Sequence, residues 1–128
     1  MCKENLLKKA NENSETAEWA EQREYYDVSI SRYYYCLYEK AIYIAMKNGF
    51  YSEPKNGKDS HNKFIANFQK NISNRLSDSE IAWLSSFGKL KRLRINADYK
   101  LKVTNKEQFE LGFKNYYVKI NNILDRLV

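Results

Sequence analysis

Apolar residues recur at helical spacing in five segments of the chain. The clearest pattern lies between about residues 26 and 48, where apolar side chains follow one another at steps of three and four: Ile30, Tyr34, Leu37, Ala41 and Ile44. The same spacing predicts amphipathic helices over about 4–21 and 106–127. We expect the helix 26–48 to be the centre of the core, and Asn48-Gly49 to end it.

Start signals predict two further helices between these segments. Ser60 can cap a short helix that ends before the polar stretch 71–74. Ser77 and Glu80 have the spacing of a capping box, in which the side chain of each residue bonds the backbone N–H of the other. The capping box predicts a fourth helix, which we expect to continue to about Tyr99.

The composition supports a mainly helical chain. The 128 residues include four glycines and one proline, too few for the many tight turns of an all-β protein. The proline and one glycine lie in the segment 50–59, which we expect to be a surface loop. The length is typical of one domain, so we predict an all-α fold, a five-helix up-and-down bundle that spans residues 1–128 as a single domain.

The positive charge is concentrated in one part of the chain. The formal net charge is +6, but residues 1–30 are net acidic. Residues 86–103 contain one acid, Asp98, and six basic residues: Lys89, Lys91, Arg92, Arg94, Lys100 and Lys102. Such a segment favours an anionic partner such as RNA or a nucleotide phosphate. A solvated helix face is the alternative interpretation.

Several kinds of site are excluded by the residues themselves. With His61 as its one histidine, the chain has no HExxH zinc motif and no histidine cage, so we expect neither a metal nor a cofactor. The glycines are scattered, which argues against a P-loop or a Rossmann phosphate loop. The paired acidic residues lie at helix starts or on polar faces, where they favour the helix dipole rather than form a two-carboxylate hydrolase site.

The cysteines and the hydropathy indicate a cytoplasmic, soluble protein without a membrane segment. Cys2 and Cys36 have neither CxxC spacing nor histidine partners, so we expect two free thiols in a reducing compartment. The longest uncharged apolar run, 41–46, is far shorter than the ~20 residues that span a membrane.

A charged pair interrupts the apolar face of the predicted fourth helix. Helical steps from Phe87 through Leu90 reach Arg94 and then Asp98, so charge falls on the face that is apolar one turn earlier. A buried arginine needs a partner, and Asp98 is placed for it at i+4. The pair either fixes this helix to the core or leaves Arg94 available to a ligand.

Tyrosines and the single histidine offer a second set of candidates. Seven of the eleven tyrosines lie between residues 25 and 43, and because they fall on several sides of a helix, some of them must lie at an interface. Core and dimer packing is one interpretation, and base stacking on exposed rings is the other. His61 is either a capping or surface group, or an imidazole kept neutral by a helix N-terminus for acid–base chemistry.

These motifs, in this order, resemble the HEPN domain, a helical fold associated with nucleotides and RNA. The resemblance extends over nearly the whole chain and rests on four motifs: Asn5-Leu-Leu-Lys-Lys-Ala10, Ser31-Arg-Tyr-Tyr-Tyr-Cys-Leu-Tyr-Glu-Lys-Ala41, Ser60-His61 and Arg94-Ile-Asn-Ala-Asp-Tyr99. It implies a homodimer with a cleft between the protomers, where polar residues gather. Many members are metal-independent ribonucleases in toxin–antitoxin or defence systems, and some pair with a small nucleotidyltransferase.

The resemblance also identifies site residues. The family's nucleases carry an Arg followed, after four to six residues, by a His, and in this chain Tyr99 stands where that His would fall. The sequence therefore looks like the branch that ends its fourth helix in Ala-Asp-Tyr, for which ligand binding is the expectation. Arg94 would hold a phosphate or pair with Asp98, Tyr99 and Tyr34 would line the cleft, and Lys91 and Arg92 would raise the positive potential.

Three functional hypotheses follow. The first is a dimeric module that binds nucleotide or RNA without efficient catalysis, since a tyrosine with a pKa of ~10 is a poor substitute for an imidazole in RNA cleavage. The second is a metal-independent ribonuclease toxin in which His61 supplies the imidazole beside Arg94, with Tyr99 as a further catalytic candidate. The third is a pure interaction protein, such as the partner of a nucleotidyltransferase.

Overall fold

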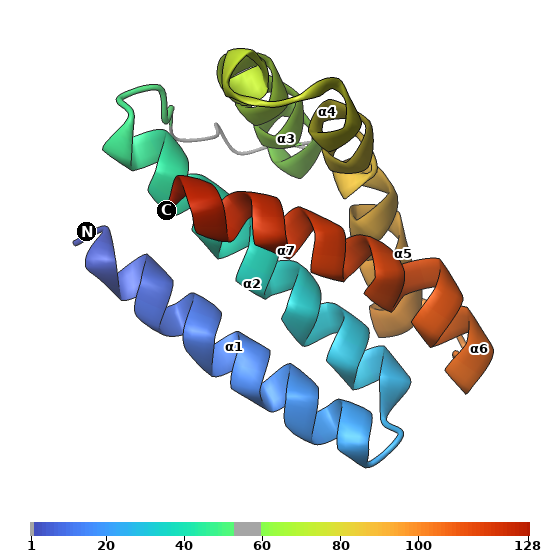
Figure 1. The fold of residues 1–128 in the computed structure, drawn as a ribbon. Helices are drawn as coiled ribbons and strands as arrows, with labels where there is room; N and C mark the ends of the chain where they lie inside the picture. Colours follow the sequence, from blue (N-terminus) through green and yellow to red (C-terminus); the bar gives the residue numbers. More distant parts are fainter. Residues whose placement is uncertain (1, 53–59) are drawn as a thin grey trace.

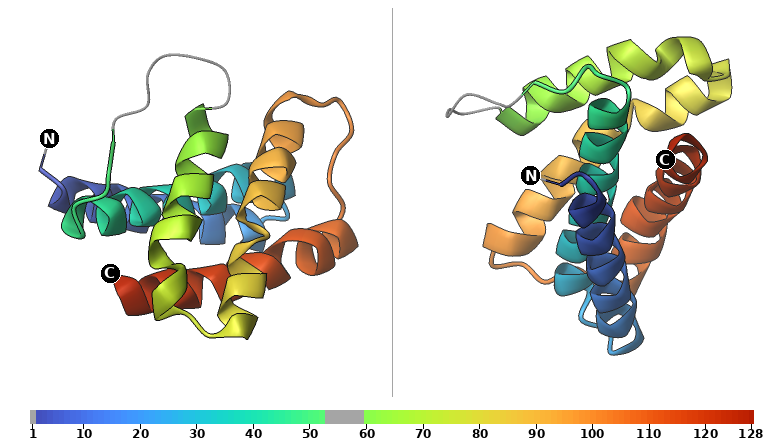
Figure 2. Two further views of the ribbon diagram at one scale, coloured as in Figure 1. Left: turned by 90° about the horizontal axis from the view of Figure 1, so that it is seen from above. Right: turned by 90° about the vertical axis from the view of Figure 1, so that its left-hand side faces the viewer.

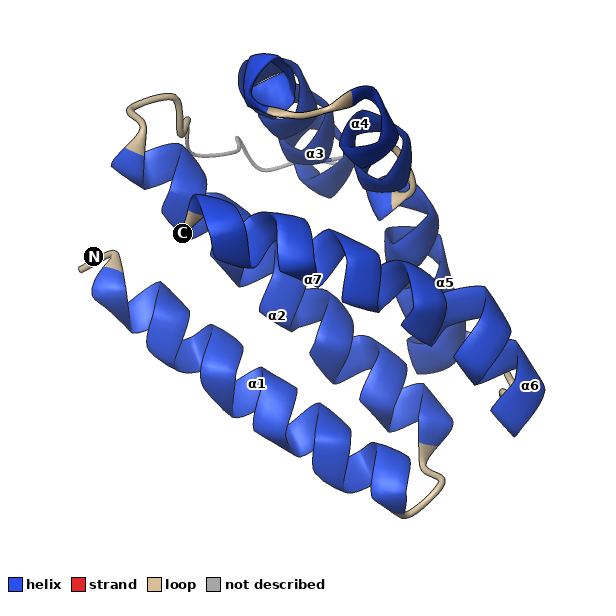
Figure 3. Cartoon of the chain, viewed as in Figure 1, coloured by secondary structure: helices blue, strands red, loops and turns tan. Residues whose placement is uncertain are grey.

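Helices form in each of the five segments in which the apolar spacing predicts one. The computed structural model describes residues 2–52 and 60–128, and within these ranges the chain contains helices, turns and loops but no strand (Figure 3). The elements in chain order are α1 (Glu4–Gln22), α2 (Tyr26–Lys47), α3 (Ser60–Ile72), η1 (Ser73–Arg75), α4 (Asp78–Leu84), α5 (Phe87–Tyr99), α6 (Lys106–Phe109), η2 (Glu110–Lys114) and α7 (Asn115–Leu127). The predicted all-α bundle is confirmed.

Helix α2 is the centre of the bundle, as its apolar pattern predicts. It packs against α1, α5 and α7, and α1 and α7 run beside it in Figure 1. Helices α3 and α4 lie across one end of these long helices, which is clearest in the right-hand view of Figure 2. This crossing brings the first turn of α3 against the side of α2.

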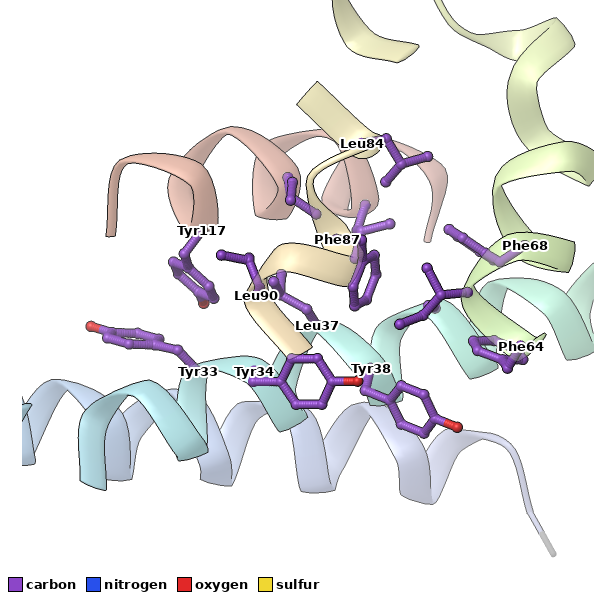
Figure 4. Close-up of a cluster of buried hydrophobic side chains, with 14 of the residues drawn as sticks. Tyr33, Tyr34, Leu37, Tyr38, Phe64, Phe68, Leu84, Phe87, Leu90 and Tyr117 are labelled. Carbon is purple, nitrogen blue, oxygen red and sulfur yellow. The ribbon is translucent and has the colours of Figure 1, made fainter. Parts of the chain in front are cut away.

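Aromatic side chains from four parts of the chain meet in the core (Figure 4). Helix α2 contributes the fully buried Tyr34, and α5 contributes Phe87, whose ring meets that of Tyr34 edge to face. Phe68 of α3 and Phe113 of η2 are also buried. Full burial of one such ring contributes about 1.5–3 kcal/mol relative to exposure, so these contacts hold the helices that carry the candidate site.

Two of the predicted helix ends are confirmed, whereas α3 continues to Ile72, past its expected end before 71–74. The Ser77 hydroxyl accepts a hydrogen bond from the Glu80 N–H, and the Glu80 carboxylate accepts one from the Ser77 N–H, which completes the capping box. Gly49 follows the last turn of α2 with a φ of 79°, a conformation that glycine adopts without strain. Of the predicted loop 50–59, residues 53–59 lie outside the described ranges.

The prediction of one continuous fourth helix is wrong. Ser85 and Ser86 separate α4 from α5, and the Ser85 hydroxyl donates a hydrogen bond to the Ala82 carbonyl. A serine side chain that bonds the preceding turn competes with the helical ladder. The break allows both Leu84 and Phe87 to be buried, although the two helices lie in different directions.

The fifth predicted helix also contains a departure from regular geometry. Residues Glu110–Lys114 form a π-helical turn, η2, between α6 and α7. Such a turn holds one residue more than an α-helical turn, and it often occurs at functional sites. Here it lies opposite the segment that follows α5.

Candidate functional site

Arg94 is buried between α5 and α2. The residue is 8% exposed, and its guanidinium carbon lies 5.4 Å from the ring centre of Tyr34 and 5.3 Å from that of Tyr35. A guanidinium over an aromatic face is attracted to the negative charge of the ring. The prediction that Arg94 points toward the core is confirmed, and the tyrosine rings, rather than their hydroxyls, contact it.

The Arg94 guanidinium makes one long contact and has one nitrogen without a partner among the described residues. Its Nη1 is 3.5 Å from Oδ2 of Asp98, at the outer limit for a hydrogen bond, so the predicted pair forms only a weak contact. Its Nε is buried and has no hydrogen-bond partner among the described residues. Because an unsatisfied buried donor costs about 1–3 kcal/mol, this orientation favours an acceptor other than those that the described residues supply.

His61 lies in the same cluster rather than on the surface. It is half-buried in the first turn of α3, and its ring stacks on that of Tyr38 with 4.1 Å between ring centres. Its Nδ1 is 3.0 Å from the hydroxyl oxygen of Tyr34. The half-buried ring of His61 contacts Tyr34, Tyr35 and Tyr38 of α2, so it links α3 to α2 as well as lying at the start of α3.

The surroundings of His61 keep its ring neutral. Burial lowers the pKa of His61 below its ordinary value of 6.5, and the positive charges of Arg94 and Lys91 lower it further. Burial also raises the pKa of Tyr34, and it raises the pKa of Tyr38 to about 12. At neutral pH the cluster therefore contains a neutral imidazole and protonated phenols beside a guanidinium cation.

The remaining predicted site residues fall in two places. Tyr34 lies beneath the cluster, fully buried, and Lys91 is close enough to act on the His61 charge. Arg92 is exposed and lies beside Leu93 and Asn96 on another face of α5, and Tyr99, the last residue of α5, is 74% exposed. The structure thus brings Arg94, Asp98, Lys91, Tyr34 and His61 together, without Arg92 or Tyr99.

Two further tyrosines belong to this cluster and were not singled out as site residues. Tyr35 packs against both Arg94 and Arg32, at 5.3 and 5.1 Å, and Tyr38 carries the stacked ring of His61. The sequence could have indicated both residues by their spacing of three on α2, which places them on one side of the helix with Tyr34.

The chemistry of this cluster, which we call the Arg94 cluster (Arg94, Asp98, Lys91, His61 and the rings of Tyr34, Tyr35 and Tyr38), suits an anion. A guanidinium binds phosphate or carboxylate oxygens in a fixed planar geometry. Within the described residues, no group of three or more His, Cys, Asp or Glu side chains is placed to hold a metal ion. None of the described helices is long and apolar enough to cross a bilayer.

Comparisons with protein-family models, with curated proteins and with solved structures find no significant match to this chain. The Arg94 cluster is therefore the feature from which a function can be inferred.

Proposed function

We propose that this chain is a homodimeric HEPN-type helical module that binds the phosphate of a nucleotide or an RNA at the Arg94 cluster. The observation that carries the proposal is the state of the Arg94 guanidinium. It is buried, its contact with Asp98 is weak, and its Nε has no partner among the described residues. A phosphate oxygen at the Nη groups would replace the long contact with Asp98 by charge-assisted hydrogen bonds.

Neighbouring residues support the same ligand chemistry. Lys91 adds a second cation near the cluster, and the neutral His61 adds a polar ring without adding charge. The ring of Tyr35 contacts the guanidinium groups of both Arg94 and Arg32, so a further cation lies near the cluster. Together these groups give a local excess of positive charge, which raises the local concentration of anions.

The binding test uses a matched pair of arginines on α5. Binding of ATP is measured by calorimetry, and binding of a fluorescein-labelled single-stranded RNA by anisotropy at fixed salt. We expect Arg94→Gln to weaken binding by about 10-fold or more, since a hydrogen bond to a charged group contributes about 1.5–3 kcal/mol. Arg92→Gln removes the same charge from an exposed position and should change affinity by less than about threefold.

Equal losses in Arg94→Gln and Arg92→Gln would overturn the proposed site, because they would indicate a nonspecific effect of net charge. Arg94→Lys keeps the charge but not the planar fork, so it should recover only part of the affinity. Circular dichroism of each variant checks that the helices are retained. Sedimentation equilibrium tests the proposed homodimer separately, and a monomer at all concentrations would remove that part.

A second candidate function, metal-independent RNA cleavage, is supported by the position of His61. The hydrogen bond to Tyr34 is compatible with either tautomer of the ring. If Nδ1–H donates to the Tyr34 oxygen, Nε2 keeps a lone pair and can accept the proton of a ribose 2′-hydroxyl. The lowered pKa keeps this base unprotonated at neutral pH.

Cleavage of labelled RNA in the presence of EDTA tests this second function. If His61 is the base, His61→Asn should reduce the rate by about 100-fold or more, while RNA affinity stays within a few-fold of the wild type. Absence of cleavage by the wild type, or full activity of His61→Asn, would leave binding as the function of the Arg94 cluster.

A further inference from the structure

A hollow lies on a different face of α5 from the Arg94 cluster. Its volume is about 420 Å³, within the range of small-molecule sites, and it is bordered by α5, the segment 100–104, the π-helical turn η2 and the start of α2. Arg94 and His61 do not line it. Leu93 and Asn96 of α5 do line it, so one helix separates the two places.

The lining of this hollow combines an apolar floor with a cationic rim. Leu93 and Val103 supply accessible apolar surface, and the buried side chains of Ile30 and Phe113 lie beneath it. Lys89, Lys100 and Lys102 lie around it, and none of the described residues that line it is acidic. An apolar site with several cations on one rim fits a ligand whose apolar body carries a negative group.

Lys89 lines the hollow from α5. Its ammonium nitrogen lies 4.1 Å from the ring centre of Tyr116, a favourable cation–π contact. A more open hollow of about 390 Å³ adjoins on the same face and shares Lys89, Leu93 and Asn96 with the first. It adds the exposed Arg92, so the cationic surface continues along α5.

Gly112 of the π-helical turn lines the hollow. The φ of Gly112 is not positive, so its backbone conformation does not require glycine. A Cβ added to Gly112 would meet no neighbouring atom within 4 Å. Glycine inside a helix costs about 0.5–1 kcal/mol relative to alanine. Neither the backbone conformation nor a close neighbour therefore requires glycine at this position, and Gly112 borders the hollow without a side chain.

We propose that this hollow is a binding site for a small amphipathic anion, an aromatic or branched apolar body that carries a carboxylate, sulfonate or phosphate group. The apolar body lies on Leu93 and Val103, above the buried Phe113 and Ile30, and the anionic group lies toward Lys100 and Lys102. The site is separate from the Arg94 cluster, so it does not depend on the function proposed there.

Two fluorescent probes test both parts of the proposal. The anion 8-anilinonaphthalene-1-sulfonate and the uncharged N-phenyl-1-naphthylamine share their aromatic body and differ by the sulfonate. We expect the folded protein to bind the sulfonate at one saturable site. The double variant Lys100→Gln with Lys102→Gln should weaken sulfonate binding several-fold and leave binding of the uncharged probe unchanged.

A matched pair of glycine variants tests the position of the site. Gly112→Leu places a side chain in the hollow and should reduce binding of both probes by about 10-fold or more. Gly88→Leu is the control, because a Cβ on Gly88 also meets no atom within 4 Å but Gly88 does not line the hollow. Unchanged sulfonate binding by a folded Gly112→Leu protein would overturn the proposal.

Amide chemical shifts of the wild-type protein provide a test that needs no variant. Titration with the sulfonate should move the amide signals of Leu93, Asn96 and Gly112. Movement confined to His61 and Arg94 would instead place the probe in the Arg94 cluster and overturn the proposed site. If the sulfonate and the uncharged probe bind equally well, both to the wild type and to the double lysine variant, the proposed role of the anionic group is overturned.

Discussion

The hydroxyl oxygen of Tyr34 lies 3.0 Å from Nδ1 of His61, so a fully buried residue of α2 fixes the histidine ring of α3. The same tyrosine ring lies under the guanidinium of Arg94 on α5. One side chain thus contacts groups from two helices that are far apart in the sequence. This relationship makes the hydroxyl of Tyr34 a direct test of the cluster.

Tyr34→Phe should destabilise the protein by about 1 kcal/mol. The change keeps the ring and its contacts but removes the partner of a half-buried nitrogen. Urea unfolding measures the difference. Tyr43→Phe is the matched control on α2, because the Tyr43 hydroxyl has no hydrogen bond with the described part of the chain. If both variants lose the same stability, the Tyr34–His61 hydrogen bond contributes nothing measurable.

The stability of the wild type should fall as the pH drops below about 6.5. The pKa of His61 is lower in the folded protein than its ordinary value of 6.5, so the unfolded chain binds a proton at a higher pH than the folded one. The contribution of His61 is therefore complete above pH 6.5 and is lost toward the folded pKa.

The variant His61→Asn isolates this contribution, because asparagine can accept or donate near the position of Nδ1 but does not titrate. The difference in unfolding free energy between wild type and variant should change between about pH 7 and 5. Other groups titrate in both proteins and cancel in the difference. A pH-independent difference would show that the His61 pKa is the same in both states.

The sequence predicted those features that depend on neighbouring residues along one helix. The stripe on α2 and the capping box at Ser77 are local patterns, and the structure confirms both. The inward position of Arg94 also followed from helical spacing alone, since charge on an apolar face is visible without knowledge of the partner helix.

The position of His61 could not be predicted in this way, because it depends on how α3 crosses the end of α2. No periodicity encodes that contact between residues 27 positions apart. The break at Ser85 and Ser86 was missed for a related reason, since serine is tolerated in helices and only packing decides whether it bends one. Similarly, the summed charge of residues 86–103 did not show that Arg94 and Arg92 lie on different faces of α5.

Asp98→Asn should increase the affinity for ATP by about threefold to tenfold if the Arg94 cluster binds phosphate. The carboxylate competes for the guanidinium and repels an incoming anion, and its removal is worth about 1 kcal/mol across a partly exposed site. The loss of folding stability should stay below about 0.5 kcal/mol, since the pair makes one long contact.

Calorimetry on wild type and Asp98→Asn at the same salt measures this effect. Asp125→Asn is a control with the same change of charge. The Asp125 carboxylate lies on α7 and pairs with Lys40 of α2 rather than with Arg94. Unchanged or weaker ATP binding by Asp98→Asn would contradict phosphate binding at Arg94. A similar gain in both variants would indicate a general effect of net charge.

The two cysteines should react with thiol reagents at very different rates. Cys2 is exposed, whereas Cys36 is fully buried in α2 beside the hydroxyl of Tyr117, 3.8 Å from its sulfur. Burial raises the pKa of Cys36, which disfavours the reactive thiolate. With Ellman's reagent we expect one rapid equivalent from Cys2, and a second whose rate follows opening of the fold.

Cys2→Ser should remove only the rapid phase, and urea should make both thiols react fast. Rapid reaction of Cys36 in the native Cys2→Ser protein would show that α2 separates from α7 far more easily than its packing implies.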